Sequence, residues 1–396
     1  MPGSTEFLEK WRLAHFSFCS LAGIRKASET SHLSYSLGVS STGDITARHL
    51  TGRLWVPGEL DLIRRVRARC GGLRAGGELR LGIGDDCALL RPRPGEDLAV
   101  TTDLTLAGRH FRLDWHPAEA VGHRTLARGL SDLAAMGARP VAAFLSLGLP
   151  RELVRKPGPR SVEAWVDRYL DGLLALAKAS GTPLAGGDLA ESPVFAADIV
   201  LIGAVRQGRA LLRSGARPGD LLYVTGALGG AAAGLARLAD WAQAGGPARA
   251  RGGTLGRRIP VPLAAVLRPH LYPEPRLAQG QWLARRGLAS AALDLSDGLS
   301  SDLGHLCEES GVAAEVDAAA VPVFPGASLR QALHGGEDYE LLFAARPEAR
   351  LPRAIAGVPV TRIGWVVRRR AGRPAMALLT AEGAQPLEPR GWEHFA

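Results

Sequence analysis

Two kinds of hydrophobic pattern alternate from residue 57 onward in this 396-residue chain. Residues 60–70 place apolar side chains at helical spacing and stop at a Gly-Gly pair, and residues 161–180 repeat that spacing before Gly181. Between them, residues 141–149 form a short, continuously apolar run that is typical of a buried strand. Because strands and helices are mixed throughout, we expect α/β or α+β domains.

The order of the segments predicts two units that meet near residue 206, spanning 57–205 and 206–396. For the first unit we expect strands at 98–102, 141–149 and 199–205, and helices at 60–70, 131–137 and 161–180. For the second we expect strands at 220–225, 291–295 and 341–344, and helices at 231–242 and 296–310. Ser131 and the pair Ser296-Asp297 are the expected N-caps of their helices, and Gly137 and Gly311 the expected stops.

The first 56 residues differ from the rest of the chain. Residues 28–51 are rich in Ser, Thr and Gly, and polar residues interrupt the moderately apolar stretch 13–24, so it lacks the clean core of a secretory signal. We expect residues 1–56 to be a poorly ordered extension, although an extra packed helix at 7–24 is the alternative. The apolar runs elsewhere are too short to span a bilayer, so we expect no membrane segment.

The charge balance is basic, with 48 Lys and Arg against 39 Asp and Glu, a net charge of +9. Arg residues are spread evenly, and the cluster at 368–370 has no interleaved aromatics, so we expect no nucleic-acid partner and consider phosphate-bearing small molecules instead. The four cysteines form no CxxC pair, which argues against a zinc site and a disulfide scaffold and favours a reducing cytoplasm.

Aspartates recur where strands are expected to end or helices to begin, next to glycines that leave room for a ligand. The instances are Gly84-Asp85-Asp86, Thr101-Thr102-Asp103, Ser131-Asp132, Gly186-Gly187-Asp188 and Asp294-Leu295-Ser296-Asp297. Carboxylates without Cys or His partners suit magnesium, which binds oxygen ligands and substrate phosphates. Taken singly, Asp132 and Asp297 also fit helix N-terminal carboxylates, but five such motifs together predict a magnesium site.

Two further segments are candidates for binding. Residues 226–230 form a glycine loop between an expected strand and helix, where backbone N–H groups could cradle an anion, although a tight turn explains the loop equally well. Residues 335–341, Gly-Gly-Glu-Asp-Tyr-Glu-Leu, could place Glu337 in a pocket or form a plain hairpin turn.

At these residues the sequence resembles the thiamine-monophosphate kinase family, in the superfamily of aminoimidazole ribonucleotide synthetase. The resemblance runs from Pro57 to the C-terminus. Its motifs are 82–90, 101–103 with 108–111, 130–138, 186–188, 213–220, 294–298, 335–341 and 391–395. The resemblance implies an N-terminal α/β domain whose strands form a barrel across a homodimer, a C-terminal α/β domain, and magnesium-dependent transfer of phosphate from ATP to thiamine monophosphate.

The resemblance also implies roles for individual residues. Magnesium ligands, direct or through water, would be Asp86, Thr101, Thr102, Asp103, Asp132, Asp188, Asp294 and Asp297. Nucleotide contacts, Asp188 included, would add Gly187, Arg213 and Ser296. The thiamine pocket would contain His110, Glu337 and Trp392. No catalytic base or covalent nucleophile is expected, because the acceptor phosphate oxygen is already a nucleophile.

The sequence departs from the family pattern at one place, and three alternative functions are considered. After Asp188 the family has two Thr and a basic residue, whereas this chain has Leu189-Ala190-Glu191-Ser192, which leaves room for a catalytically silent nucleotide-binding scaffold. A selenophosphate synthetase would need a reactive Cys in an N-terminal glycine-rich loop, and the chain has none in such a setting. Aminoimidazole ribonucleotide synthetase itself would lack the closing Trp-containing motif.

Overall fold

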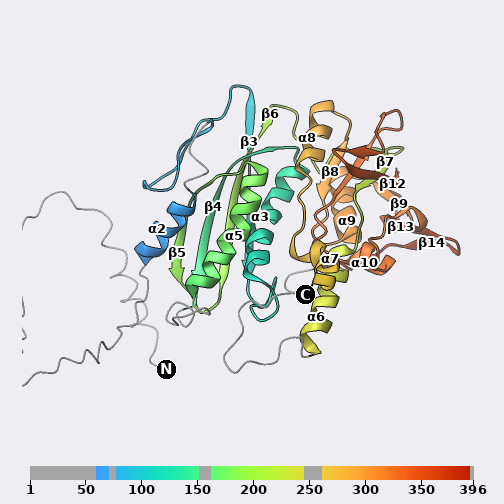
Figure 1. Cartoon of the computed structure of the whole chain (residues 1–396). Helices are drawn as coiled ribbons and strands as arrows, with labels where there is room; N and C mark the ends of the chain where they lie inside the picture. Colours follow the sequence, from blue (N-terminus) through green and yellow to red (C-terminus); the bar gives the residue numbers. More distant parts are fainter. Residues whose placement is uncertain (1–58, 71–76, 151–161, 245–260, 393–396) are drawn as a thin grey trace, which may run out of the picture. The chain divides into compact units, whose positions relative to one another are not determined.

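The structure is a computed structural model that describes residues 59–70, 77–150, 162–244 and 261–392 (Figure 1). The described residues belong to one compact unit. The extension predicted for residues 1–56 lies outside the described residues.

The N-terminal part is built on a four-stranded sheet with the strand order β3-β6-β4-β5. Its strands are β3 (Glu96–Leu106), β4 (Arg139–Leu149), β5 (Leu184–Glu191) and β6 (Ala196–Arg206). β6 pairs antiparallel with both β3 and β4, and β4 pairs parallel with β5. A short hairpin of β1 (Leu79–Leu81) and β2 (Leu89–Leu90) packs its Leu79 into a small cluster on the opposite face from the main core.

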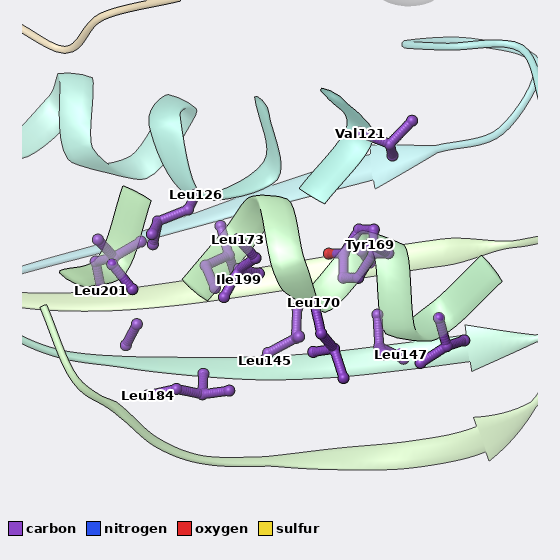
Figure 2. Close-up of a cluster of buried hydrophobic side chains, with 14 of the residues drawn as sticks. Val121, Leu126, Leu145, Leu147, Tyr169, Leu170, Leu173, Leu184, Ile199 and Leu201 are labelled. Atoms are coloured by element: carbon purple, nitrogen blue, oxygen red, sulfur yellow. The ribbon is translucent and has the colours of Figure 1, made fainter. Parts of the chain in front are cut away.

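Helices α3 (Ala118–Ala135) and α5 (Val162–Ser180) cover one face of this sheet. Figure 2 shows Leu145, Ile199 and Leu201 pointing from the strands toward these helices. The two helices approach each other at glycines: a Cβ on Gly122 would lie 1.9 Å from the Tyr169 carbonyl oxygen. Residues without a side chain are therefore required for the close packing that fixes α3. Helix α2 (Glu59–Cys70) also belongs to this part.

The C-terminal part contains an eight-stranded sheet with the order β14-β13-β9-β12-β7-β10-β8, and β11 added at β12. Its strands are β7 (Leu221–Thr225), β8 (Ala291–Asp294), β9 (Ala313–Asp317), β10 (Leu341–Ala345), β11 (Ala354–Ile355), β12 (Val358–Val367), β13 (Met376–Thr380) and β14 (Gly383–Pro386). Its helices are α6 (Gly230–Gln243), α7 (Val261–Leu271), α8 (Leu277–Arg286), α9 (Leu299–Ser310), η1 (Ala318–Ala320) and α10 (Leu329–His334).

The two parts meet along α3. The C-terminal end of this helix packs against α8 and β8, and a Cβ on Gly280 would lie 1.8 Å from the Ala134 carbonyl oxygen. Leu283 and Phe343 continue this contact into a buried cluster, while α9 packs on the sheet through a separate cluster that contains Leu303. The residues of α3 that face the C-terminal part are thereby held in fixed positions.

The helices and strands that the hydrophobic patterns predict are present, with two corrections at helix ends. Ser131 is not an N-cap, because α3 begins at Ala118 and buries Ser131 near its C-terminal end. Neither Ser296 nor Asp297 caps α9: the N-cap residue is Gly298, and Asp302 accepts hydrogen bonds from the Asp297 and Gly298 amides. Gly137 and Gly311 follow their helices with positive φ, as expected.

Within the described ranges, no helix has the length and apolar character that crossing a membrane requires.

Candidate active site

A cavity of about 410 Å³ opens between the two parts of the molecule. The loop after β3, helix α3, the start of α6, the β8–α9 connection, the segment 336–339 and Trp392 line it. Eight of the residues selected from the sequence belong to the lining: Asp103, His110, Asp132, Asp294, Ser296, Asp297, Glu337 and Trp392. The cavity is therefore where most of the predicted site comes together.

One end of the cavity carries carboxylates from three elements. Asp132 lies on α3 and accepts a hydrogen bond from the Thr101 hydroxyl on β3. Asp294, at the end of β8, accepts a 2.6 Å hydrogen bond from the Ser131 hydroxyl. Asp103 accepts from Arg128 at 3.1 Å. Each carboxylate thus has a fixed orientation from a neighbour on α3 or β3.

The acidity of these carboxylates reflects their crowding. Burial, together with the charges of Asp294 and Asp103, raises the pKa of Asp132 to about 7. Burial and the Asp103 charge also raise the pKa of Asp294, and burial raises that of Asp103 against the lowering effect of Arg128. The positive charge of Arg213 lowers the pKa of both Asp132 and Asp294 and so partly offsets the rise. A bound cation would remove the repulsion and favour the ionised forms.

The start of α9 adds a further buried acid. Asp302 accepts from the Asp297 amide at 3.1 Å and the Gly298 amide at 3.0 Å. Burial and the charges of Asp294 and Asp297 nevertheless raise the pKa of Asp302 to about 8. Asp302 therefore holds the loop in place while Asp297 lines the cavity.

Glu337 also lines the cavity. Its backbone has φ of 68°, a conformation that L-residues rarely adopt outside functional sites, and its amide donates to the Ser296 carbonyl at 2.7 Å. Gly336 is required beside it, because a Cβ there would lie 2.5 Å from the same carbonyl oxygen. The Arg124 guanidinium donates to Glu337 at 2.5 Å. The structure therefore favours the pocket interpretation of this segment over a plain hairpin turn.

Trp392 and His110, the other two residues predicted for the thiamine pocket, also line the cavity. Trp392 is 53% exposed, and its amide donates to the Asp297 carbonyl at 3.1 Å. Gly391 allows this approach, because a Cβ there would lie 2.2 Å from the Asp297 carbonyl oxygen. His110 accepts from the Leu106 amide at Nδ1, at 3.0 Å, which assigns the proton of the neutral ring to Nε2.

Six predicted residues do not line the cavity: Asp86, Thr101, Thr102, Gly187, Asp188 and Arg213. Thr101 contacts the site through Asp132, and Arg213 acts on it through its charge. Asp188 is in register with Ser146, Ser146 with Asp198, and Asp198 with Leu104. Because neighbouring residues of a strand point to opposite faces, this row faces away from Asp103.

The predicted position of these acids at element ends is therefore only partly right. Asp103 and Asp188 lie inside β3 and β5, and Asp132 lies near the end of α3 rather than at its start. Thr102 and Asp188 are exposed on the sheet face opposite α3, and Asp86 is exposed near the β1–β2 hairpin. In the part of the chain that is described, no three His, Cys, Asp or Glu side chains lie close enough to hold a metal ion by themselves.

The glycine loop at 226–230 binds a carboxylate of the same chain. Asp338 accepts from the Gly229 amide at 2.6 Å and from the Ala231 amide at 3.0 Å, at the start of α6. The loop thus binds an anion as its backbone predicts, but that anion is Asp338. Gly226 is needed because a Cβ there would lie 2.0 Å from an oxygen of Glu340.

Several residues in the cavity lining, such as Arg128 and Trp115, and Arg124, which contacts the lining residue Glu337, are absent from the residues selected from the sequence. Arg124, Arg128 and Asp132 follow one another at four-residue intervals, which places them on one face of α3. That spacing could have identified the two arginines once the helix was extended to Ala118. Trp115, which stacks with the Arg112 guanidinium at 4.6 Å, carries no such signal.

Comparisons with known proteins agree on the class of this fold. Residues 84–205 match the family model described as "AIR synthase related protein, N-terminal domain", and residues 217–376 match "AIR synthase related protein, C-terminal domain". The chain therefore has the two-domain architecture of the AIR synthase-related proteins.

The relatives are more specific. The thiamine-monophosphate kinase of Escherichia coli K12 is 40% identical over 351 residues, which cover 86% of this chain and 98% of that protein. The crystal structure of thiamine-monophosphate kinase from Stenotrophomonas maltophilia is 37% identical, with a TM-score of 0.65 over 78% of this chain and 94% of that one. A structure described as "AaThiL complexed with AMPPCP and TMP" is 29% identical, with a TM-score of 0.63 over 85% and 97% of the two chains. The chain belongs to the thiamine-monophosphate kinase family and is an enzyme, a kinase.

Proposed function

We propose that this protein transfers the terminal phosphoryl group of ATP to thiamine monophosphate, giving thiamine diphosphate and ADP. The observation that carries the proposal is the single cavity that joins the carboxylates Asp132 and Asp294 to the wall formed by Glu337 and Trp392. The names of the relatives support the choice of substrate, and the AaThiL complex with AMPPCP and TMP supports ATP as the donor.

Three residues of the cavity suit the thiamine half of the substrate. Trp392 presents an exposed aromatic ring, which stabilises a cation such as a thiazolium through its negative face. Glu337 offers carboxylate oxygens that offset the positive charge or accept from the aminopyrimidine. His110 lines the same cavity.

Magnesium suits the carboxylates of the cavity. Asp132 and Asp294, with Asp103 and Asp297 nearby, are oxygen donors whose mutual repulsion a divalent cation would relieve. Magnesium usually takes one or two carboxylates and completes its shell with waters and phosphates, so it does not need a three-carboxylate cage. When bound, it would neutralise charge that develops on the transferred phosphoryl group. Thr101 supports these carboxylates through Asp132. We retain Asp86, Thr102 and Asp188 as proposed metal or phosphate contacts, although they lie outside the cavity and Thr102 and Asp188 are on the sheet face opposite α3.

The nucleotide contacts that we propose are Ser296 in the cavity lining, Arg213 near the carboxylates, and Gly187 with Asp188 on β5. Arg213 is exposed and would reach anionic phosphates without first breaking a buried ion pair.

Transfer would be direct and in line. A phosphate oxygen of the acceptor is already anionic, so the step needs positioning and charge neutralisation rather than a general base. The protein would hold the acceptor between Glu337 and Trp392 and would present its phosphate toward the carboxylate end. No side chain would carry a covalent phosphoryl group.

The segment 189–192 weakens the contacts that the family makes with phosphates. It lacks the two Thr and the basic residue, and Glu191 adds a negative charge at the exposed end of β5. The cavity residues do not depend on this segment, so we propose an active enzyme rather than a silent scaffold.

We also propose a homodimer, with the four-stranded sheet forming a barrel with its partner copy. β3 is an edge strand, and its Leu98, Val100 and Leu104 are 45%, 62% and 48% exposed on the face away from α3. Exposed apolar side chains in a row are typical of an interaction surface. The same face carries Thr102, so the partner copy would cover a predicted phosphate-region residue.

We further propose that the enzyme consists of two domains, 57–205 and 206–396. We also propose that it is located in the cytoplasm. The boundary is supported by the gap between the matched ranges, which end at 205 and begin at 217. The location is supported by the free thiols of Cys70, Cys87 and Cys307.

A coupled ADP assay with magnesium, comparing thiamine monophosphate with free thiamine, tests the proposal. We expect ADP to form with thiamine monophosphate only. Activity with free thiamine alone, or with neither compound, would overturn the assignment, and tight ATP binding without ADP formation would favour the silent scaffold.

A further inference from the structure

Among the described residues, three arginines line the cavity, and they differ in how far they are withdrawn from solvent. Arg109 is exposed. The side chain of Arg112 is 54% exposed, pairs with Asp114 and stacks on Trp115. The side chain of Arg128 is only 17% exposed and still belongs to the lining. Because charges attract more strongly where less water surrounds them, Arg128 is the arginine best suited to bind an anion in this cavity.

The contacts of Arg128 leave part of its guanidinium available to a ligand. Its Nε and Nη2 groups donate to one oxygen of Asp103, Oδ1, at 3.3 Å and 3.1 Å. Among the described residues, no protein group accepts a hydrogen bond from its Nη1 group. A guanidinium carries five N–H donors in a rigid plane. The pair with Asp103 therefore orients the group, and the donors on Nη1 remain for a molecule in the cavity.

The position of Arg128 on α3 relates the two kinds of predicted site residue. Arg124, one turn earlier, donates to Glu337 of the predicted thiamine pocket. Asp132, one turn later, belongs to the predicted metal ligands and lines the cavity. With a rise of 1.5 Å per residue, each step of four residues covers about 6 Å along the helix axis. Arg128 therefore lies midway between the residue that holds Glu337 and the carboxylate of Asp132.

The charge of Arg128 is maintained in this setting. Burial lowers its pKa, but Tyr339 and the charges of Asp103 and Glu337 raise that pKa above its ordinary value. Asp103 and Glu337 therefore both lie within electrostatic reach of the guanidinium. Since an arginine already keeps its proton throughout the neutral range, Arg128 is a permanent cation between the two sets of residues.

The acceptor substrate brings an anion to this part of the cavity. In thiamine monophosphate a short arm joins the phosphate to the thiazolium ring. With the ring beside Glu337 and the phosphate directed toward Asp132, the phosphate lies next to Arg128. Five carboxylates of the lining repel an anion as it enters: Asp103, Asp132, Asp294, Asp297 and Glu337. A guanidinium offsets this repulsion and forms charge-assisted hydrogen bonds with phosphate oxygens.

We propose that Arg128 binds the phosphate group of thiamine monophosphate and thereby favours this compound over free thiamine. The inference rests on the proposed function, because it concerns the acceptor in the same cavity. Arg128 pairs with Asp103 in the substrate-free protein and donates from Nη1 to the acceptor phosphate when the substrate binds. Because this contact exists before as well as during the transfer, its loss affects substrate binding more than turnover.

Arg128→Met removes the guanidinium and keeps an unbranched apolar stem. We expect its KM for thiamine monophosphate to rise at least about tenfold, as for loss of a hydrogen bond between charged groups. Its kcat should stay within about fivefold, and its KM for ATP within about threefold, of the wild-type values. Arg128→Lys keeps the charge without the planar donors, so its KM for thiamine monophosphate should lie between those of wild type and Arg128→Met.

Free thiamine, which lacks the phosphate, reports on the route of the effect. As a competitor of thiamine monophosphate in the wild-type enzyme, it should have an inhibition constant at least about tenfold above the KM for thiamine monophosphate. Arg128→Met should change this inhibition constant by less than about threefold, because the ring contacts are retained. A general disturbance of the cavity would weaken both compounds alike.

Two controls separate the guanidinium from its ion pair. Asp103→Asn breaks the same pair and leaves Arg128 in place, so it should not raise the KM for thiamine monophosphate by more than about threefold, whatever its turnover. Arg168→Met removes another arginine that is ion-paired at α3. Arg168 lies on α5 and donates to Glu119 at 2.7 Å and 2.8 Å, outside the cavity lining, and its loss should change neither KM nor kcat.

Several results would overturn the inference. They are an unchanged KM for thiamine monophosphate in Arg128→Met, a loss confined to kcat, an equal weakening of free thiamine, and an equal rise in Asp103→Asn. A rise in Arg109→Met without one in Arg128→Met would assign the phosphate to Arg109 instead. Circular dichroism melting identifies a variant that fails to fold, and Arg128→Lys, with an expected rise of at least about threefold, then replaces Arg128→Met. Wild-type protein without activity on thiamine monophosphate would refute the proposed function itself, so the two failures are distinguishable.

Discussion

Replacing Asp132 by Asn should have opposite effects on stability and on turnover. The raised pKa of Asp132, about 7 against an ordinary 3.8, means that the folded protein holds this proton up to near neutral pH, while the unfolded chain releases it near pH 3.8. The folded state therefore binds more protons between these values, and its stability falls as the pH rises through that range. The loss of stability that comes from ionising the buried Asp132 carboxyl is complete above about pH 7.

The size of this cost follows from the shift. About three pKa units correspond to roughly 4 kcal/mol for complete ionisation, an upper value because Asp132 and Asp294 share the repulsion. Asn is isosteric and neutral, and its side-chain oxygen can still accept from Thr101. We therefore expect Asp132→Asn to raise the free energy of unfolding by about 2–4 kcal/mol at about pH 8, without nucleotide or magnesium.

Urea unfolding followed by tryptophan fluorescence, with chelator present, measures this change, and the coupled ADP assay measures turnover. Turnover should fall at least about a hundredfold, because the neutral Asn amide is a poorer ligand for the metal that would neutralise charge on the transferred phosphoryl group. Asp240→Asn, at an exposed position on α6, is the control and should change neither quantity. A variant less stable than wild type at this pH would refute the repulsion argument, and near-normal turnover would remove Asp132 from the metal region.

Three further predictions concern other parts of the molecule. His116 has a folded-state pKa of about 3 against 6.5 unfolded, so its own contribution to stability should fall by about 2 kcal/mol between neutral pH and pH 5, opposite in sign to that of Asp132; the difference in free energy of unfolding between wild type and His116→Asn isolates it, and a difference that stays constant over that range would contradict the buried, neutral state of His116. Gly122→Ala should cost about 2 kcal/mol or more, because the new methyl group would meet the Tyr169 carbonyl, and an unchanged midpoint in denaturant would argue against the close α3–α5 contact. Val100→Asp should shift the protein from dimer to monomer in light scattering while leaving the fold intact, and a variant that stays dimeric would exclude the β3 face as the interface.

The strands and most helices could be predicted from the sequence because their apolar residues alternate or recur with a clear period. The first part of helix α3 was not predicted, since the helix is buried on nearly all sides and small residues such as Ala118 and Gly122 take the place of large apolar side chains at its start. The incomplete helix in turn made Ser131 look like an N-cap and placed Asp132 at the wrong end.

The candidate site was predicted to the extent that local motifs carry it. Glu337, Trp392 and Asp294 lie in motifs whose glycines fix the backbone, and they line the cavity. The contacts of Arg124 and His270 join residues about 150 positions apart, and no local pattern reports them. Strand alternation, however, was available from the start: Thr102 and Asp103 are adjacent on β3 and could not both have faced α3.

Transfer of label from γ-labelled ATP tests the central claim most directly. With magnesium and thiamine monophosphate, the account predicts that the label appears in thiamine diphosphate in step with ADP, and that quenched samples contain no labelled protein. Label recovered as inorganic phosphate, or bound to the protein on the timescale of turnover, would contradict direct transfer in the cavity formed around Asp132, Asp294 and Glu337.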